Sequence, residues 1–171
     1  MKSAELLLDA FGRIQEAVHE AVEGLSVDEL AVRVDPDANS IGWLVWHLTR
    51  VTDDHLADAF DTGQAWTGED WSGRFGLPFP DGDVGFGHDS AQVAAVRADA
   101  GLLLGYHDAV HARVLDQVGS VTAAGLDRVV DTRWTPHVTL GPRLISLVAE
   151  GNQHAGQAAY IRGIVERRRT S

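Results

Sequence analysis

The sequence predicts an all-α fold in which four long helices pack as a bundle. Four segments place apolar residues at helical spacing, at about 4–23, 41–60, 91–118 and 141–168. Residues suited to helix caps stand near the ends of these segments. The length, 171 residues, fits a single domain over 1–171. Four long helices in so short a chain favour a bundle.

The first two helices have clear boundaries. The first ends before Gly24, a residue suited to a helix C-cap. Residues 26–29 match a capping box and predict one further turn. A loop then leads to Asn39 or Ser40, either of which can cap the second helix. The first half of that helix, IGWLVWHL, is apolar nearly all round, so we expect it to be deeply buried.

Residues 61–89 differ in composition from the helices around them. They hold seven glycines and two prolines, which indicates a long irregular connection, with one turn of helix near 69–71. A connection of this length is unusual in a compact domain and often carries function. Its two tryptophans, Trp66 and Trp71, either pin it to the bundle or belong to a site.

The rest of the chain also divides at cap residues. Ser90 can cap the third helix, and Thr122 a short turn after it. Residues 129–136 indicate an extended segment. Thr139 or Pro142 then opens the last helix, since proline suits a first helical turn.

Charge and composition exclude several classes of function. The chain has 25 acidic residues against 14 Lys and Arg, with a formal net charge of −11, which argues against nucleic acid and against anionic membranes as partners. The basic run 167–169 suits the C-terminus of the last helix. No apolar run approaches the 18 or so residues of a transmembrane helix, and the first residues do not form a secretory segment. We therefore expect a cytoplasmic protein.

The absence of cysteine is equally informative. It excludes disulfides, thiolate metal ligands and a cysteine nucleophile. Any thiol chemistry must therefore use a thiol from outside the chain.

Two pairs of candidate metal ligands lie four residues apart on predicted helices: Glu150 with His154, and His107 with His111. This spacing puts both side chains on one helix face, about 6 Å apart along the axis. Either pair alone is weak evidence, because such pairs are commonly solvated. Taken alone, the histidine pair is the more obvious zinc pattern.

Apolar surroundings distinguish Glu150 and His154 from the other pair. A carboxylate beside an apolar face needs a partner, and a metal ion is one such partner. His47 lies in IGWLVWHL, where almost no other polar side chain is near. It is either a core histidine bonded to a carbonyl or a metal ligand.

Several motifs carry a resemblance to a known family. The segment NSIGWLVWHL followed by DDH, and NQHAGQAAYIRG near the end, resemble the DinB/YfiT-like family of metal-binding four-helix bundles. The RFGLPF and GYHDAVHAR segments resemble it as well, so the resemblance extends over essentially the whole chain. It implies a long crossover connection between the second and third helices.

The resemblance also implies one divalent metal ion held by His47, Glu150 and His154. Family members use a histidine of the WHL motif and two residues four apart on the fourth helix. Many carry histidine at the position of Glu150, and the glutamate variant resembles the mycothiol-dependent maleylpyruvate isomerase branch. Two imidazoles and a carboxylate suit zinc with an open position, with nickel, iron or manganese as alternatives.

Three further residues are candidates for roles around this metal. Asp54 returns to the helix face of His47 within about 20°, and it either accepts a hydrogen bond from a ligand or lies on the surface. Gln157 can orient His154 or a substrate, or simply pack. Arg162 can receive an anionic substrate or form an internal ion pair.

The functional expectation follows from the resemblance. It implies a metal-dependent S-transferase or isomerase that uses a low-molecular-weight thiol of the mycothiol or bacillithiol type. The partners are then a small-molecule thiol and an electrophile, with no nucleic acid and no membrane, and relatives imply a homodimer. The alternatives are a non-catalytic metal or small-molecule binding protein and a metal-dependent hydrolase.

Overall fold

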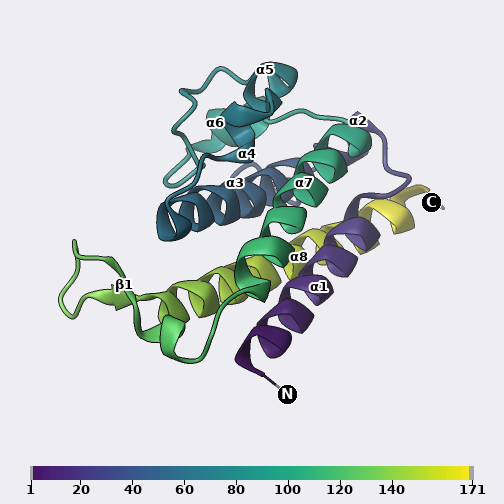
Figure 1. Ribbon diagram of the computed structural model, residues 1–171. Coiled ribbons are helices and arrows are strands. Elements are labelled where there is room, and N and C mark those ends of the chain that lie inside the picture. The colour runs from purple at the N-terminus through teal and green to yellow at the C-terminus, as the bar shows by residue number, and fades with distance from the viewer. Residues whose placement is uncertain (1, 170–171) are drawn as a thin grey trace.

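Four long helices form the body of the protein in a computed structural model that describes residues 2–169 (Figure 1). They are α1 (Ser3–Val22), α3 (Ile41–Phe60), α7 (Ala100–Gly119) and α8 (Leu140–Arg169). α1 and α3 each pack against both α7 and α8. This arrangement confirms the all-α bundle, and the predicted bounds of the first, second and last helices agree to within one residue or two.

The neighbouring helices α3 and α7 run in the same direction. Thr49 in the middle of α3 hydrogen-bonds His107 of α7, and Thr62 beyond the end of α3 hydrogen-bonds Gln117 near the end of α7. A short loop cannot join parallel neighbours, because the chain must first return along their length. The connection over residues 61–99 makes this return and is the crossover that the family resemblance implies.

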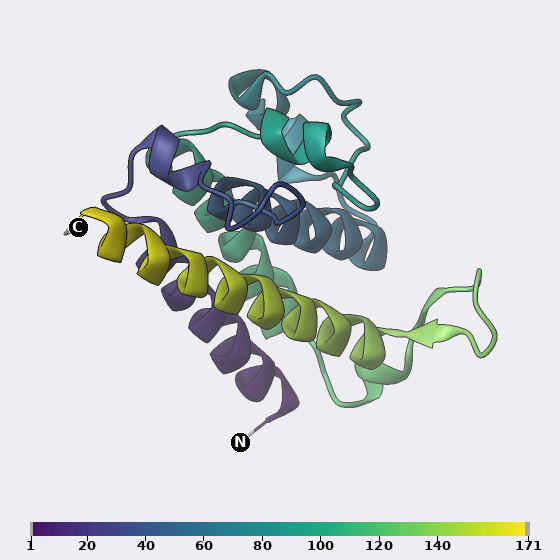
Figure 2. The same ribbon diagram turned by 180° about the vertical axis from the view of Figure 1, so that it is seen from behind.

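α3 is buried nearly all round in its first half, as predicted. Ser40 caps it, the hydroxyl accepting a hydrogen bond from the backbone N–H of Trp43 at 3.1 Å. Leu44, Trp46 and Leu48 are each 1% exposed. α8 lies antiparallel beside it, as Figure 2 shows from behind. The seam between α3 and α8 is therefore long and well packed.

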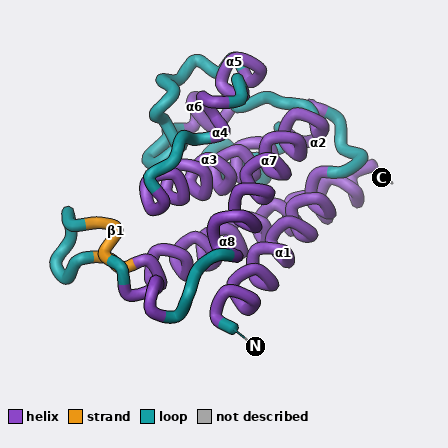
Figure 3. The backbone as a smooth tube through the Cα atoms, viewed as in Figure 1, coloured by secondary structure: helices purple, strands orange, loops and turns teal. Residues whose placement is uncertain are grey.

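The crossover connection contains three short helices and long irregular stretches (Figure 3). The helices are α4 (Ala65–Gly68), α5 (Trp71–Phe75) and α6 (Ser90–Ala95). Trp66 and Trp71 are 4% and 9% exposed, and both rings pack against Tyr106 of α7. The tryptophans therefore pin the connection to the bundle, the first of the two roles predicted for them.

A buried arginine also holds this connection against α3. The Arg50 side chain is fully buried and donates hydrogen bonds to the backbone carbonyls of Asp81 and Asp83. Asp53, one turn later, accepts from the backbone N–H groups of Ala65 and Trp66. These backbone groups, together with the side chains of Gln64 and Tyr106, satisfy both charges and fix the loop relative to α3.

The prediction of one unbroken helix over 91–118 was wrong. α6 ends at Ala95, the chain is extended at Val96, and α7 begins at Ala100. The cause is a second cap, because the Asp99 side chain accepts from the backbone N–H of Leu102 at 2.8 Å. Asp89, rather than Ser90, caps α6.

The other short elements lie where the sequence predicts them. A capping box at Ser26 opens α2 (Val27–Leu30). After α7, a 3-10 turn, η1 (Ala124–Asp127), leads to β1 (Val129–Asp131), which pairs antiparallel with β2 (Val138–Thr139). Within residues 2–169, no helix is long and apolar enough to cross a membrane.

Candidate metal centre

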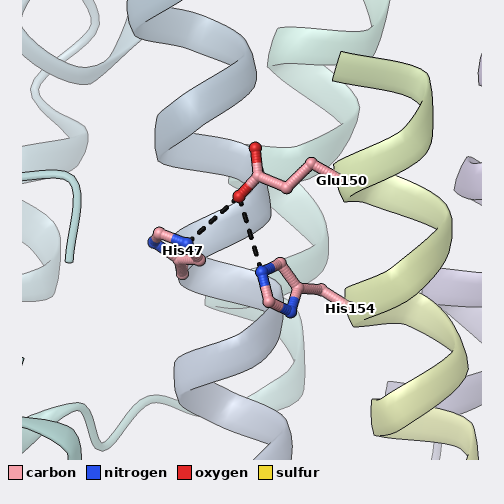
Figure 4. A group of neighbouring side chains, drawn as sticks. All are labelled: His47, Glu150 and His154. Carbon is pink, nitrogen blue, oxygen red and sulfur yellow. Dashed lines mark ion pairs between the residues drawn. The ribbon is translucent and has the colours of Figure 1, made fainter. Parts of the chain in front are cut away.

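Three side chains converge at the seam between α3 and α8 (Figure 4). The Nε2 atoms of His47 and His154 lie 3.1 Å and 3.5 Å from Oε1 of Glu150. The ligand atoms of the three residues all lie within 4.8 Å of one another. Within residues 2–169, this is the group of three or more His, Asp or Glu whose geometry suits a metal ion.

The backbone explains why these residues meet. Glu150 and His154 are one helical turn apart on α8 and project from the same face. His47 projects from α3 toward them, and the two helices are antiparallel neighbours. The His47 side chain is 9% exposed, whereas that of Glu150 is 26% exposed. The group is therefore buried on the α3 side and open on the α8 side.

Hydrogen bonds on the far side of each ring fix the imidazole tautomers. Nδ1 of His47 donates to the backbone carbonyl of Val84, and Nδ1 of His154 lies 2.9 Å from Oε1 of Gln157. Both acceptors lack a proton to give, so each Nδ1 carries the hydrogen. In the neutral rings, the two Nε2 lone pairs then face the carboxylate, which is the arrangement a metal requires of histidine.

The loop carries Val84 over the His47 ring because a glycine follows it. Gly85 has φ of +91°, and a Cβ there would lie 2.9 Å from Nδ1 of His47 and 2.9 Å from the ring of Trp46. Only glycine allows both this conformation and this close approach. Sequence reasoning offered a carbonyl partner for His47 as one alternative but did not identify Val84, although a glycine-rich stretch, DGDVGFG, marks the place.

A second set of polar contacts anchors the same loop. The Trp43 indole N–H donates to Nδ1 of His88 at 3.1 Å, and Nε2 of His88 lies 3.0 Å from the Asp83 carboxylate. Asp83 also accepts from the backbone N–H of Gly85 at 2.7 Å. The Trp43 ring stacks on the His47 ring, with centroids 4.5 Å apart. The loop and α3 thus hold the His47 imidazole from two sides.

The electrostatics of the group favour a bound cation. Without a metal, burial raises the pKa of the Glu150 carboxyl, but the hydrogen bonds that His154 and His47 donate when Nε2 carries a proton outweigh burial and lower that pKa to about 2. The hydrogen bond to Glu150 raises the pKa of His154 against the opposing effect of burial. The carboxylate is therefore ionised at neutral pH and attracts positive charge. A divalent cation fits this donor set and competes with a proton for it.

Comparison with known proteins places the chain in a family. A family model described as mycothiol-S-transferase matches residues 6–167. This chain belongs to the mycothiol-S-transferase family. A crystal structure of a conserved protein from Enterococcus faecalis is similar at 30% identity and a TM-score of 0.89, covering 96% of this chain and 98% of that one. The comparison with curated proteins finds no significant match.

The family match confirms the DinB-like resemblance. The structure shows what each of the three further candidate residues contacts. Gln157 accepts from His154, so it lies where it can orient that ring. Asp54 instead accepts a hydrogen bond from Gln64 of the connection at 2.8 Å. Arg162 donates to Glu166 and to the carbonyl of Glu23, the internal pairing that was one of its two predicted roles.

The rival pair on α7 lies in a different environment. His107 and His111 are 7% and 8% exposed, and Nδ1 of His107 hydrogen-bonds the Thr49 hydroxyl at 3.0 Å. Apolar side chains of α1, Phe11 and Ile14, lie around them. Burial lowers the pKa of His107 to about 4, so its ring is neutral at physiological pH.

Proposed function

We propose that this member of the mycothiol-S-transferase family is a metal-dependent S-transferase or isomerase that uses a low-molecular-weight thiol. His47, Glu150 and His154 are the proposed ligands of one divalent metal ion. The observation that carries the proposal is the convergence of two tethered imidazoles on an ionised carboxylate. The family to which the chain belongs supports the thiol as co-substrate.

The three proposed ligands would contribute different donors to the ion. Glu150 contributes the negative charge, and the two imidazoles contribute neutral nitrogen donors. Three protein ligands leave a position for an outside group. The chain has no cysteine, so no thiol of its own competes for that position.

The chemistry of a thiol makes such a position useful. A free thiol has a pKa near 8.5, so only a few per cent is ionised at pH 7. A divalent metal bound by these residues would stabilise the thiolate, and the concentration of ionised thiol at neutral pH would rise roughly 10- to 100-fold. In the transfer, the sulfur forms a bond to an electrophilic carbon while the leaving group departs with its electron pair. The thiol proton passes to solvent.

Cobalt substitution tests this proposal directly. With cobalt in the site, mycothiol or bacillithiol at millimolar concentration should give a sulfur-to-metal charge-transfer band near neutral pH. The same thiol should be consumed with a model electrophile, and His154→Ala should abolish that consumption. If fully metallated protein shows neither band nor consumption, the transferase proposal is wrong.

A second candidate function is a non-catalytic small-molecule binding protein. A cavity of about 520 Å³ with mainly apolar walls is lined by Leu44 and Gln157, each three residues from a proposed ligand, and its volume is that of an ordinary ligand site. An apolar cavity can bind a small molecule without any reaction at a metal ion. The cobalt experiment separates the two candidates, because a binder needs no thiolate.

Zinc is the metal we propose first, since it suits two imidazoles, a carboxylate and an open position. Metal analysis of purified protein distinguishes it from nickel, iron and manganese. The cytoplasmic location and the homodimer stay predictions. Sedimentation analysis of the metallated protein tests the second of these.

A further inference from the structure

The cavity of about 520 Å³ near the candidate metal centre has mainly apolar, uncharged walls. It is formed by the loop before α3, the start of α3 and the outer face of α8. Its walls contain no charged side chain, and their polar groups are uncharged amides and one phenol. The residues that line it include Val34, Asn39, Leu44, Gln153, Gly156 and Gln157.

Two of the lining residues connect the cavity to the metal centre. Gln157 lines the cavity and also accepts the hydrogen bond from Nδ1 of His154. Gln153 precedes His154 in α8 and also lines the cavity. On α3, Leu44 lies three residues before His47, within about one helical turn. The cavity is therefore lined by residues that lie within about one helical turn of the proposed ligands His47 and His154.

A second cavity, near the C-terminal end of α3, has the opposite character. It has a volume of about 420 Å³, is mainly polar, and is lined by Asp54, Asp58 and Asp61 together with His55 and Arg133. Burying an uncharged apolar group against three carboxylates would desolvate charge without compensation. The two cavities therefore favour different chemical groups. The apolar one suits an uncharged molecule with an aromatic or aliphatic body.

We propose that the apolar cavity binds the electrophile, and that the electrophile is an uncharged molecule with an aromatic or aliphatic body. The amides of Asn39 and Gln153 are suited to hydrogen-bond its nitro, carbonyl or ester oxygens. This inference rests on the proposed function, because it names the substrate class of the same site. The thiol and a second copy of this chain are the alternative occupants that the experiment must exclude.

Gly156 makes the cavity testable without disturbing the fold. A Cβ at this position meets no heavy atom within 4 Å, so the absence of a side chain leaves space open. Gly156→Leu should fill that space, and leucine is also the better helix former. Gly12→Leu is the matched control, because Gly12 is helical, is equally free of neighbours and lies on α1.

The first measurement is binding without chemistry. 2,4-Dinitrotoluene is an uncharged aromatic molecule with no leaving group, and calorimetry should show that it binds metallated wild-type protein and Gly12→Leu. Gly156→Leu should bind it at least about tenfold more weakly, a typical effect of misfit in an apolar pocket. Val34→Asp, which adds a charge to a half-exposed position on the opposite wall, should also weaken binding. Unchanged affinity in both variants overturns the proposal.

The second measurement identifies the occupant during the reaction. With 1-chloro-2,4-dinitrobenzene and iodoacetamide as electrophiles, Gly156→Leu should lower the ratio of their kcat/KM values at least about tenfold. If it raises the KM of the thiol instead, the cavity holds the thiol and the proposal is wrong. If it changes only the sedimentation of the protein, the cavity is a contact between copies and the proposal is wrong.

The two proposals fail in different ways. If dinitrotoluene binding depends on Gly156 but no thiol is consumed, the cavity assignment stands and the transferase proposal fails. If thiol is consumed equally by wild type and by both cavity variants with either electrophile, transfer stands and the cavity assignment fails.

Discussion

Two pairs of residues at the same spacing have different surroundings in this bundle. Glu150 and His154 on α8 face His47 across the seam with α3, and the three ligand atoms converge. His107 and His111 on α7 face a threonine and the apolar side chains of α1. The α8 pair is partly exposed at the seam, while the α7 pair is buried in the core. Spacing along one helix therefore does not make a metal site, because a third donor must project from a neighbouring helix.

The comparison also shows how each pair meets its hydrogen-bonding needs. Both rings proposed as ligands donate from Nδ1 to an oxygen, which leaves each Nε2 directed at the carboxylate. His107 also bonds through Nδ1, but its buried Nε2 has no partner within residues 2–169. The small cavity beside it is about 10 Å³, which is enough for about one water molecule. The α7 pair therefore has the geometry of core histidines.

Substituting a proposed ligand should give the largest difference between the α8 pair and the α7 pair. Purified wild-type protein should contain about one divalent metal per chain, and His154→Ala should contain almost none. The reason is that two ligands cannot replace the affinity of three in a site open to water. Metal analysis by mass spectrometry makes the measurement.

The α7 pair supplies the matched control for this loss. His107→Ala combined with His111→Ala should leave the metal content at about one per chain. The opposite result, metal lost from the α7 double variant and retained by Glu150→Ala, would show that the wrong helix has been assigned.

Much of the fold follows from the sequence because caps and apolar stripes are local signals. Ser40 marks the start of α3, and the apolar run after it correctly predicts burial. The break before α7 escaped prediction, because Asp99 is as compatible with a continuous exposed helix face as with a cap. The choice depends on packing, in which Val96 is 1% exposed, and no periodicity reveals it.

The proposed ligand set came only from the family resemblance, and the groups that support these side chains were predictable only in part. Gln157 was identifiable because it lies three residues after His154 on one helix. The Val84 carbonyl was not, since a backbone group leaves no residue-type signal and the loop is distant in sequence. Asp54 has the right helical phase, but Gln64 from the crossover connection bonds it. The phase of Asp54 on its helix does not predict that the crossover connection folds back and places Gln64 against it.

The buried histidine on α7 should show itself in the pH dependence of stability. Burial lowers the pKa of His107 to about 4, whereas an unfolded histidine has a pKa near 6.5. Between these values the unfolded chain binds more protons, so stability is complete above pH 6.5 and falls toward pH 4. The loss should be roughly 2–3 kcal/mol.

Urea unfolding of metal-free protein from pH 7 to pH 4.5 measures this loss. His107→Leu should have a flatter stability profile than wild type over that range, whatever its stability at pH 7. The metal-ligand residues titrate equally in both proteins, so the difference between profiles isolates His107. Parallel profiles would mean that His107 does not resist protonation.

The loop over His47 should matter to the metal although it supplies no ligand atom. Gly85→Ala places a Cβ against the His47 ring and strains a backbone with positive φ, so it should shift the ring and lower metal affinity about 10- to 100-fold. Gly82→Ala, in the same loop with no neighbour within 4 Å of its Cβ, is the control and should bind normally. Competition with a chromophoric chelator gives both affinities. Equal affinities would show that the loop does not position His47.

Gln157 should give the smallest effect at the metal, because its hydrogen bond to His154 is exposed to solvent. In Gln157→Ala, water can replace the lost acceptor but cannot hold the ring as firmly, so metal affinity should fall about tenfold or less. Gln157→Glu keeps an oxygen acceptor and adds a charge that makes the imidazole more basic. It should therefore bind metal at least as tightly as wild type in the same chelator competition. If the alanine and glutamate variants bind metal equally, the Gln157 oxygen does not orient His154, and metal affinity depends on the three proposed ligands alone.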